Sequence, residues 1–329
     1  ISVHNTSQLL PRCLDSVVTQ SLKGIEVILI NNGSTDTSLQ IMEKYQQEFP
    51  EVIKIFSQED RGLAQGRQSG INNATGEYIT FLDADDYITE DAYDKMYTSA
   101  IAKGVDIVEC NTIREGLLIG SNYEGVQKAE KVLKDYFYNG DVPSMMWMRL
   151  YKKRLFDKPV FPEMYVNNED VFAFPYLLFK ARDIYFLKEQ LHFYTTDNEN
   201  SVMISIKKKA VEEDRIIENR IKTLNVKQHL EEKIGKQVID KGFSDEFSYY
   251  TARLILDFCL NDFRTLSTKK TIELALEKVG LKYSDVKPRY KNIKYNNKLI
   301  QSLVNTFGLE TTTSLYRVLT RLRAKLKPN

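Results

Sequence analysis

The stretch "GEYITFLDADD", residues 76–86, joins a strand-like apolar run to a cluster of carboxylates. Its first part is rich in β-branched and aromatic residues, which is typical of a strand that packs in a core. Asp83, Asp85 and Asp86 follow where that strand should end. Because crowded carboxylates repel one another, the cluster requires a cation, a basic partner or open solvent to stay ionised.

The sequence around this stretch alternates between strand-like and helix-like periods. Apolar, β-branched runs recur at 24–32, 52–57, 77–83 and 105–110. Helical spacing of apolar residues occurs at 8–20 and 35–49. The alternation predicts an α/β fold with an open, mostly parallel sheet flanked by helices. Ligands of such sheets bind beyond the carboxyl ends of the strands, which is where the carboxylate cluster lies.

The chain of 329 residues is long enough for two domains of unequal size. From about 111 to 204 the pattern is less regular, with short strands expected at 183–187 and 191–195. Beyond about residue 205 the pattern becomes helical and rich in Lys and Glu. We therefore expect an α/β domain over residues 1–204 and a mainly helical C-terminal domain over residues 205–329.

The composition is that of a globular protein, with 42% hydrophobic and 28% charged residues. The net charge of +1 provides no global field that would attract nucleic acid, so nucleic acid is not an expected partner. The three cysteines are widely spaced and odd in number, which indicates a reduced, cytoplasmic setting. No apolar run reaches the roughly 18 residues that a membrane-spanning helix requires.

Two interpretations of the carboxylate cluster follow from the residues. Acidic residues favour the first turn of a helix, which accounts for Glu90 and Asp91 but not for Asp83, since Asp83 still belongs to the strand. Hard cations such as Mg²⁺ and Mn²⁺ bind oxygen ligands and bridge carboxylates to substrate phosphates. The turn "INNGSTD", residues 30–36, could offer backbone amides to such an anion, although Asn-Gly turns are also common structural connectors.

Four motifs occur in one order along the chain. They are "NNGSTD" (31–36), "GLAQGRQSG" (62–70), "GEYITFLDADD" (76–86) and "NNEDVFAF" (167–174). Together they resemble the motifs of the family 2 glycosyltransferases of the GT-A fold, over roughly residues 1–204. The resemblance implies a bacterial, inverting enzyme that depends on a nucleotide sugar. It also implies a nucleotide-sugar half over about 1–100 and an acceptor half over 101–204.

The resemblance assigns roles to individual residues of the nucleotide-sugar half. The implied nucleotide-sugar site consists of Asn5, Asn32, Arg67, Asp83, Ala84 and Asp85. Asp83 would face the ribose and base, and Asp85 would ligate a divalent metal, Mn²⁺ or Mg²⁺, held on the diphosphate. Asn32 replaces the Asp that reads uracil in the family, and its amide can both donate and accept, so uridine recognition is retained. Family members have a longer segment between Val3 and His4, so we expect an omitted segment there.

The resemblance also supplies the acceptor half of the reaction. Asp170, with Glu169 as the alternative, matches the general base that takes a proton from the acceptor hydroxyl. Without the other motifs, the start of a helix would be the preferred interpretation of this acidic pair, and the motifs reverse that preference. Trp147, the only tryptophan, could stack on an acceptor sugar or pack in the core.

The segment "LHFYTTDNENSVM" contains His192, which could be a metal or phosphate contact or a structural histidine. Related enzymes often have Tyr-Tyr-Arg near this point. Here the family-like Arg is missing, so Thr195 or a neighbouring residue would have to replace it.

The C-terminal third carries no chemical motif. Residues 314–327 place leucines and a valine on one helical face and basic residues around the other. Such a helix suits an anionic membrane surface, where similar enzymes meet lipid-linked acceptors, and it equally suits docking on its own domain. A peripheral position at the inner face of the cell membrane is therefore one expectation. A homo-oligomer is also compatible with the sequence.

The resulting prediction is an inverting, metal-dependent glycosyltransferase. It would move a hexosyl or N-acetylhexosaminyl group from a UDP-sugar to a hydroxyl of a saccharide or lipid-linked saccharide, in bacterial surface polysaccharide or glycoconjugate synthesis. One rival is a sugar-phosphate nucleotidyltransferase, whose usual Gly-rich, basic N-terminal loop is absent here. The other is a non-catalytic partner subunit of the GT-A fold, which the intact Asp85 and Asp170 disfavour.

Overall fold

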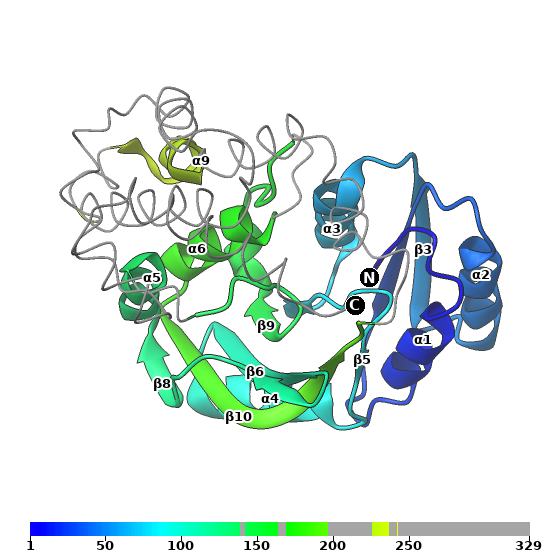
Figure 1. The fold of residues 1–329 in the computed structure, drawn as a ribbon, viewed down its shortest axis with the longest axis horizontal. Helices are drawn as coiled ribbons and strands as arrows, with labels where there is room; N and C mark the ends of the chain where they lie inside the picture. The colour runs from blue at the N-terminus through cyan, green and yellow to red at the C-terminus, as the bar shows by residue number, and fades with distance from the viewer. Residues whose placement is uncertain (139–141, 164–168, 197–225, 237–241, 243–329) are drawn as a thin grey trace, which may run out of the picture. The chain divides into compact units, whose positions relative to one another are not determined.

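The computed structural model describes residues 1–138, 142–163, 169–196, 226–236 and 242 (Figure 1). Its helices are α1 (Leu10–Val18), α2 (Ser38–Glu48), α3 (Gly62–Asn73), α4 (Ala92–Lys103), α5 (Ala129–Tyr138), α6 (Asp170–Lys180) and α9 (Val226–Ile234), with a 3₁₀ turn η1 (Lys153–Phe156). Its strands are β1 (Ser2–Val3), β2 (Val27–Asn32), β3 (Ile53–Gln58), β4 (Tyr78–Thr80), β5 (Tyr87–Ile88), β6 (Ile107–Arg114), β7 (Leu117–Ile119), β8 (Gly125–Lys128), β9 (Arg149–Lys152) and β10 (Asp183–Tyr194).

The chain divides into two compact units. The first comprises Ile1–Leu133 with Asp141–Val211, and the second comprises Lys134–Gly140 with Glu212–Asn329. The first unit carries all the motifs of the sequence. The boundary expected near residue 205 and the helix expected at 314–327 lie outside the described residues, so both stay predictions.

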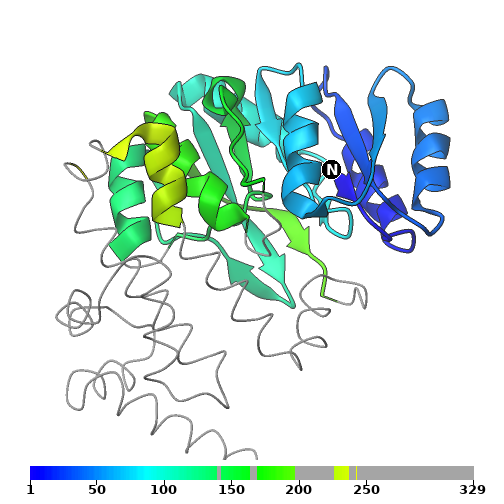
Figure 2. The same ribbon diagram turned by 90° about the horizontal axis from the view of Figure 1, so that it is seen from above.

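The strands of the first unit form two sheets. In the first sheet, β1, β2 and β3 pair in that order and run parallel, with Ser2 opposite Ile30 and Val27 opposite Ile53. All six residues of β2 are buried, as a strand covered on both faces requires. Helix α3 packs on β1 and β2, and α2 packs on β2 and β3 from the opposite face (Figures 1 and 2). The expected βαβ architecture is confirmed for this part of the chain.

The second sheet is mixed rather than mostly parallel. Its order is β4-β9-β6-β10-β5, and among these neighbours only β6 and β10 run parallel. Strand β10 is a single strand of 12 residues where two short strands were expected. Register shifts between Phe186 and His192 interrupt its pairing with β6, which explains why its sequence pattern breaks in the middle.

The short β1 leads directly into the turn at Asn5. The Ser34 hydroxyl donates to the Val3 carbonyl and accepts from the Asn5 N–H. One hydroxyl therefore bonds both sides of His4 and joins the end of β1 to the turn. The omitted segment expected between Val3 and His4 stays a prediction.

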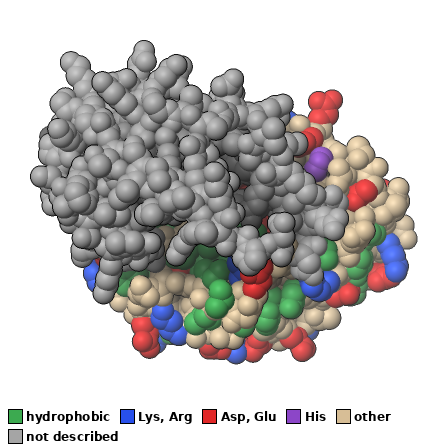
Figure 3. Space-filling model, in the orientation of Figure 1, with side chains coloured by type: hydrophobic (Ala, Val, Ile, Leu, Met, Phe, Trp, Pro, Cys, Tyr) green, Lys and Arg blue, Asp and Glu red, His purple; other side chains and the backbone are tan. Residues whose placement is uncertain are grey.

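Charged side chains of both signs are interspersed over the described surface in view in Figure 3, in agreement with the net charge of +1. Within the described part of the chain, no helix combines the length and hydrophobicity needed to cross a bilayer.

Candidate active site

A single buried guanidinium joins two of the sequence motifs. Arg67 lies on α3, and its side chain is only 4% exposed. Its Nη1 donates to Glu169 Oε1 at 2.5 Å and to Asp170 Oδ1 at 2.6 Å. Its Nη2 donates to Asp83 Oδ1 at 2.7 Å. The end of the apolar strand run and the acidic pair before α6 therefore meet on one side chain.

This cluster holds more negative than positive charge. Burial alone would lower the pKa of Arg67, but the three surrounding carboxylates raise it, so the arginine stays charged. Burial raises the pKa of Glu169 to about 8, opposed by Arg67, and burial also raises the pKa of Asp170. One arginine cannot neutralise three carboxylates, so the site favours a bound proton or a further cation.

Local structure explains the position of the acidic pair. Helix α6 begins at Asp170, and the Glu169 carbonyl accepts from the N–H groups of Phe172 and Ala173. An acidic residue in the first turn stabilises a helix through the helix dipole. The acidic pair therefore both starts helix α6 and belongs to the Arg67 cluster, so the two interpretations are compatible.

The three aspartates of residues 83–86 have three different environments. Asp83 and Asp85 are half-buried, and Asp83 is paired with Arg67. Asp86 is fully buried, and its Oδ1 accepts from the Thr195 N–H at 2.8 Å. Burial, followed by the charges of Asp83 and Asp85, raises the pKa of Asp86 to about 9. Asp86 is therefore protonated at neutral pH, and its neutral form relieves the repulsion among the three aspartates of residues 83–86.

The described residues contain no group of three or more His, Cys, Asp or Glu side chains that could enclose a metal ion. Mg²⁺ and Mn²⁺ accept one or two carboxylates when substrate phosphates and water complete the coordination. Asp85, half-buried beside the charged cluster, fits that role as a hard oxygen ligand. The donor set fits a cation that arrives with a diphosphate better than one that the protein alone retains.

His192 is not directed toward this site. It is 1% exposed, with Nδ1 2.5 Å from Thr112 Oγ1 and Nε2 3.5 Å from Asp86 Oδ2. Burial lowers the pKa of His192 to about 3, so a neutral imidazole faces the protonated Asp86. The proposed role of His192 as a metal ligand is not supported by this geometry, since both ring nitrogens face buried protein groups.

Trp147 lies in the core. It is 7% exposed and stacks on the His192 ring, with the centroids 4.3 Å apart and the planes 15° apart. Tyr194 lies against it at 5.7 Å. Since its surface is covered by protein, the core-packing alternative describes Trp147 in this structure better than stacking on an acceptor sugar.

Asn32 and Asn5 support loops instead of presenting their amides to a ligand. Asn32 is buried, and its Nδ2 donates to Asp60 Oδ1 at 2.9 Å while its Oδ1 accepts from Gln58 Nε2 at 2.7 Å. Asn5, at a φ of 53°, accepts at Oδ1 from the Thr35 N–H at 2.8 Å. The proposed reading of uracil by Asn32 is therefore not supported, because protein groups already occupy its donor and acceptor.

Ala84 separates the two half-buried aspartates. It is 4% exposed and belongs to the hydrophobic core. This small apolar residue packs in the core, whereas Asp83 and Asp85 on either side of it are half-buried.

Two residues near the site, Asp60 and Arg12, were not singled out from the sequence, and a third, Thr195, was given a different role. Asp60 bonds Asn32, and its backbone nitrogen lies 2.6 Å from where a Cβ at Gly33 would be, so only glycine fits there. Arg12, in the first turn of α1, donates through Nη2 to the Asp85 carbonyl and to Thr195 Oγ1. Thr195 had been considered only as a replacement for a missing arginine. Single polar residues on a helix or loop give no periodic signal, which is why the sequence did not reveal their proximity.

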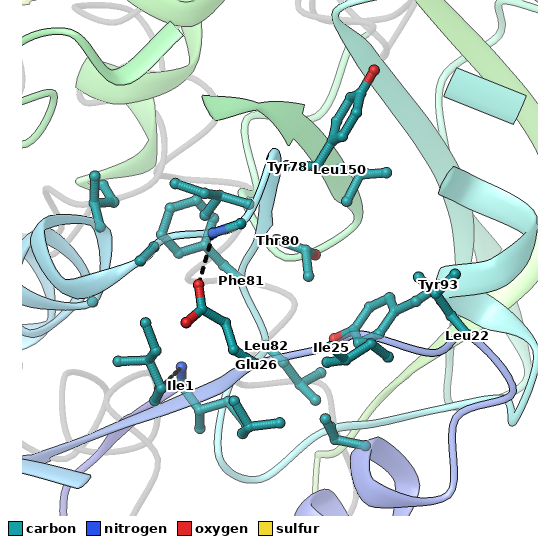
Figure 4. A pocket seen from close by; sticks show the side chains of 18 of the residues that line it. Ile1, Leu22, Ile25, Glu26, Tyr78, Thr80, Phe81, Leu82, Tyr93 and Leu150 are labelled. Carbon is teal, nitrogen blue, oxygen red and sulfur yellow. Dashed lines mark hydrogen bonds between the residues drawn. The ribbon is translucent and has the colours of Figure 1, made fainter. Parts of the chain in front are cut away.

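A separate apolar cavity of about 320 Å³ lies between β2 and β4 (Figure 4). Ile1, Leu22, Ile25, Tyr78 and Tyr93 are among its lining residues. Of the predicted site residues only Arg67 lines it. Strands β2 and β4 belong to different sheets, and the cavity lies between them and is partly open. It is not the candidate active site.

Comparison with known proteins identifies the class. Residues 1–159 match the family model "Glycosyl transferase family 2". Glycosyltransferase GlyA of Streptococcus pneumoniae is 30% identical over 207 residues, 59% of this chain and 30% of GlyA. The cholesterol galactosyltransferase of Borreliella burgdorferi is 31% identical over 210 residues, 59% of this chain and 58% of that protein. Residues 1–159, just under half of the chain, are therefore similar to glycosyltransferase family 2, and the chain spans less than two thirds of the length of these relatives.

Solved structures confirm the fold. The crystal structure of Staphylococcus aureus TarS 1–349 in complex with UDP-GlcNAc superimposes with a TM-score of 0.65 at 18% identity, covering 97% of this chain and 90% of that one. The expected GT-A fold is therefore confirmed, and the sequence recognition of the family is confirmed with it.

Proposed function

We propose that the protein is an inverting, metal-dependent glycosyltransferase that uses a nucleotide sugar. The observation that carries the proposal is the Arg67 cluster, in which one guanidinium bonds Asp83 of the expected donor motif and Asp170 of the expected acceptor motif. Transfer between two substrates requires that both be held at one point. The family match supports the same reaction class.

In this proposal Asp170 is the general base that accepts the proton of the acceptor hydroxyl. A base is most effective when its pKa lies near the working pH, and burial raises the pKa of Asp170 in that direction. Glu169 shares Arg67 with Asp170 and is the alternative base. Attack by the activated oxygen opposite the leaving diphosphate inverts the anomeric centre.

Asp83 and Asp85 are the residues proposed for the donor side. Asp85 would hold Mn²⁺ or Mg²⁺ together with the donor diphosphate, and the metal would neutralise the negative charge of that leaving group. Arg67 would keep Asp83 and Asp170 in place while the donor is bound.

We propose a UDP-linked hexose or N-acetylhexosamine as donor. Two matched proteins support sugar transfer by name, the cholesterol galactosyltransferase and the poly(ribitol-phosphate) beta-glucosyltransferase of Bacillus spizizenii, and TarS was crystallised with UDP-GlcNAc. A saccharide or lipid-linked saccharide would be the acceptor, in synthesis of bacterial surface polysaccharide or glycoconjugate. Cytoplasmic residence with peripheral attachment to the membrane through residues 314–327 is part of the same proposal.

The test is a screen of UDP-, GDP- and TDP-sugars for hydrolysis in the presence of Mn²⁺, with release of the nucleoside diphosphate as the readout. We expect UDP release from one UDP-sugar, abolished by EDTA and restored by Mn²⁺. Pyrophosphate formation from a sugar phosphate and UTP would instead identify a nucleotidyltransferase. Absence of both activities, together with absence of nucleotide binding, would support the non-catalytic partner subunit.

A further inference from the structure

Arg12 is an exposed arginine fixed by three contacts with two distant segments, the turn that carries Asp85 and the end of β10. It lies in the first turn of α1. Its Nη2 donates to the Asp85 carbonyl at 3.1 Å and to Thr195 Oγ1 at 2.5 Å. Its Cζ lies 4.5 Å from the centroid of the Tyr87 ring. These partners are 73 and more residues away in the sequence, so the folded chain assembles this position.

The contacts orient the guanidinium without using all of its donors. Both hydrogen bonds go through Nη2, and within the described residues no hydrogen bond is formed by Nε or Nη1. Stacking on Tyr87 and the two hydrogen bonds restrict the rotamers that a free surface arginine would sample. The planar group is thus preorganised for a further ligand.

The chemistry of that ligand follows from the charges nearby. A guanidinium presents a planar fork of donors that matches phosphate oxygens in a bidentate way. The neighbouring Asp83 and Asp85 would repel a diphosphate, and Arg12 supplies a fixed positive charge beside their turn. The positive charge of Arg12 also opposes the rise in the pKa of Asp86, so it acts on the aspartates of residues 83–86.

We propose that Arg12 binds the diphosphate of the nucleotide-sugar donor and stabilises it as the leaving group. The inference rests on the proposed function and assigns it a residue outside all four motifs. Thr195, which has no charge of its own, acts by holding Arg12 in place. Arg12, which bonds the Asp85 carbonyl, would contact the diphosphate beside a metal held by Asp85.

The alternative is that Arg12 only ties α1 to the Asp85 turn and Thr195. Calorimetric binding separates the two, because UDP and UMP contain phosphate and uridine does not. The variants are Arg12→Gln, which removes the charge, and Arg12→Lys, which keeps it. The matched control is Arg182→Gln, whose exposed side chain precedes β10 at the end opposite Thr195.

We expect Arg12→Gln to weaken UDP binding, measured with EDTA and again with Mn²⁺, by about 10- to 100-fold, the scale of a hydrogen bond to a charged group. Uridine affinity should change by less than about twofold. Arg12→Lys keeps the charge and should therefore show a smaller loss of UDP affinity than Arg12→Gln. Arg182→Gln should behave as the parent. Thermal unfolding of each variant verifies that it is folded.

Two results would overturn the inference while leaving the proposed function intact: UDP affinity unchanged in Arg12→Gln, or an equal loss for UDP and uridine, which indicates a structural role. A parent protein that binds neither UDP nor any other nucleotide would overturn the proposed function itself. Rescue of Arg12→Gln by Thr195→Arg, which returns a guanidinium to the same place from the other side of the contact, would support a phosphate role. Failure of that rescue would count against the phosphate role. So would a loss of UDP binding in Arg12→Gln that is explained by unfolding of the variant.

Discussion

Two buried arginines of the same unit have opposite charge environments. Arg149 is fully buried and donates to one carboxylate, Glu109, through Nε at 2.9 Å and Nη2 at 2.5 Å. Its remaining donors meet the carbonyls of Met145 and Pro143, and its Cζ lies 3.8 Å from the Phe174 ring. Arg67, equally enclosed, faces three carboxylates.

The difference distinguishes a structural ion pair from a cluster that can take part in binding and catalysis. A buried arginine with one carboxylate and backbone carbonyls is neutral as a unit and needs nothing more. Arg67 leaves its cluster with excess negative charge, and this excess occurs where two sequence motifs meet. An imbalance of this kind raises the free energy of the empty site. Binding of a proton or a cation lowers that free energy.

The largest expected effect is on the unbalanced cluster. Asp170→Asn keeps the shape of the side chain but removes the proton acceptor, so sugar transfer should fall by about two to four orders of magnitude. UDP binding with Mn²⁺ should persist, because Asp170 does not belong to the donor side. Glu169→Gln is the matched control, one residue away on the same guanidinium. A parent-like rate for Asp170→Asn with loss of transfer in Glu169→Gln would reverse the two assignments.

The balanced pair should respond in stability instead. Arg149→Met leaves Glu109 buried without a partner, and Glu109→Gln leaves an unpaired arginine, so each should lower the free energy of unfolding by about 3–5 kcal/mol. Urea denaturation measures the loss. The double variant Arg149→Met/Glu109→Gln should recover part of it, since no unpaired charge is left. A double variant as unstable as the sum of the two single changes would contradict this interpretation of the pair.

The sequence could predict one of these arginines but not the other. Arg67 stands in a motif whose order and spacing relate it to Asp83 and Asp170. Arg149 and Glu109 are ordinary charged residues 40 positions apart, and only the antiparallel pairing of β6 and β9 brings them together.

The same limit applies to the fold and to the rest of the site. The parallel first sheet follows from short β-branched runs, whereas the mixed second sheet depends on pairings that no local pattern encodes. For His192 and Trp147 the residue type allowed either a ligand contact or a structural role, and for Asn32 the resemblance implied a ligand contact. All three side chains are buried in this structure. Side-chain direction depends on tertiary packing, which is not contained in a local motif.

A smaller effect is expected on the donor side of the cluster. Asp85→Asn replaces a carboxylate by a neutral amide, a poorer ligand for a hard cation. Mn²⁺-dependent UDP binding should weaken at least about tenfold, since even residues that only support a ligand cost about 10- to 100-fold. UDP binding measured in EDTA serves as the control and should change little. Equal losses with and without Mn²⁺ would show that Asp85 acts without a metal.

The smallest effect concerns the proton that the unbalanced cluster favours. Burial raises the pKa of Glu169 from 4.5 to about 8, so the folded state holds this proton more tightly than the unfolded chain. The resulting stabilisation is fully present below about pH 4.5 and is lost as the pH rises through about 8.

Glu169→Gln cannot ionise, so between pH 5 and 8 its free energy of unfolding should fall less steeply than that of the parent, by at most about 1.4 kcal/mol per pH unit. Urea denaturation at several pH values measures the difference, with Glu163→Gln, at an exposed position, as the control for the loss of an acidic group. A variant that instead loses stability relative to the parent as the pH rises would mean that Arg67 holds Glu169 ionised, and the cluster would then resemble the balanced pair at Arg149.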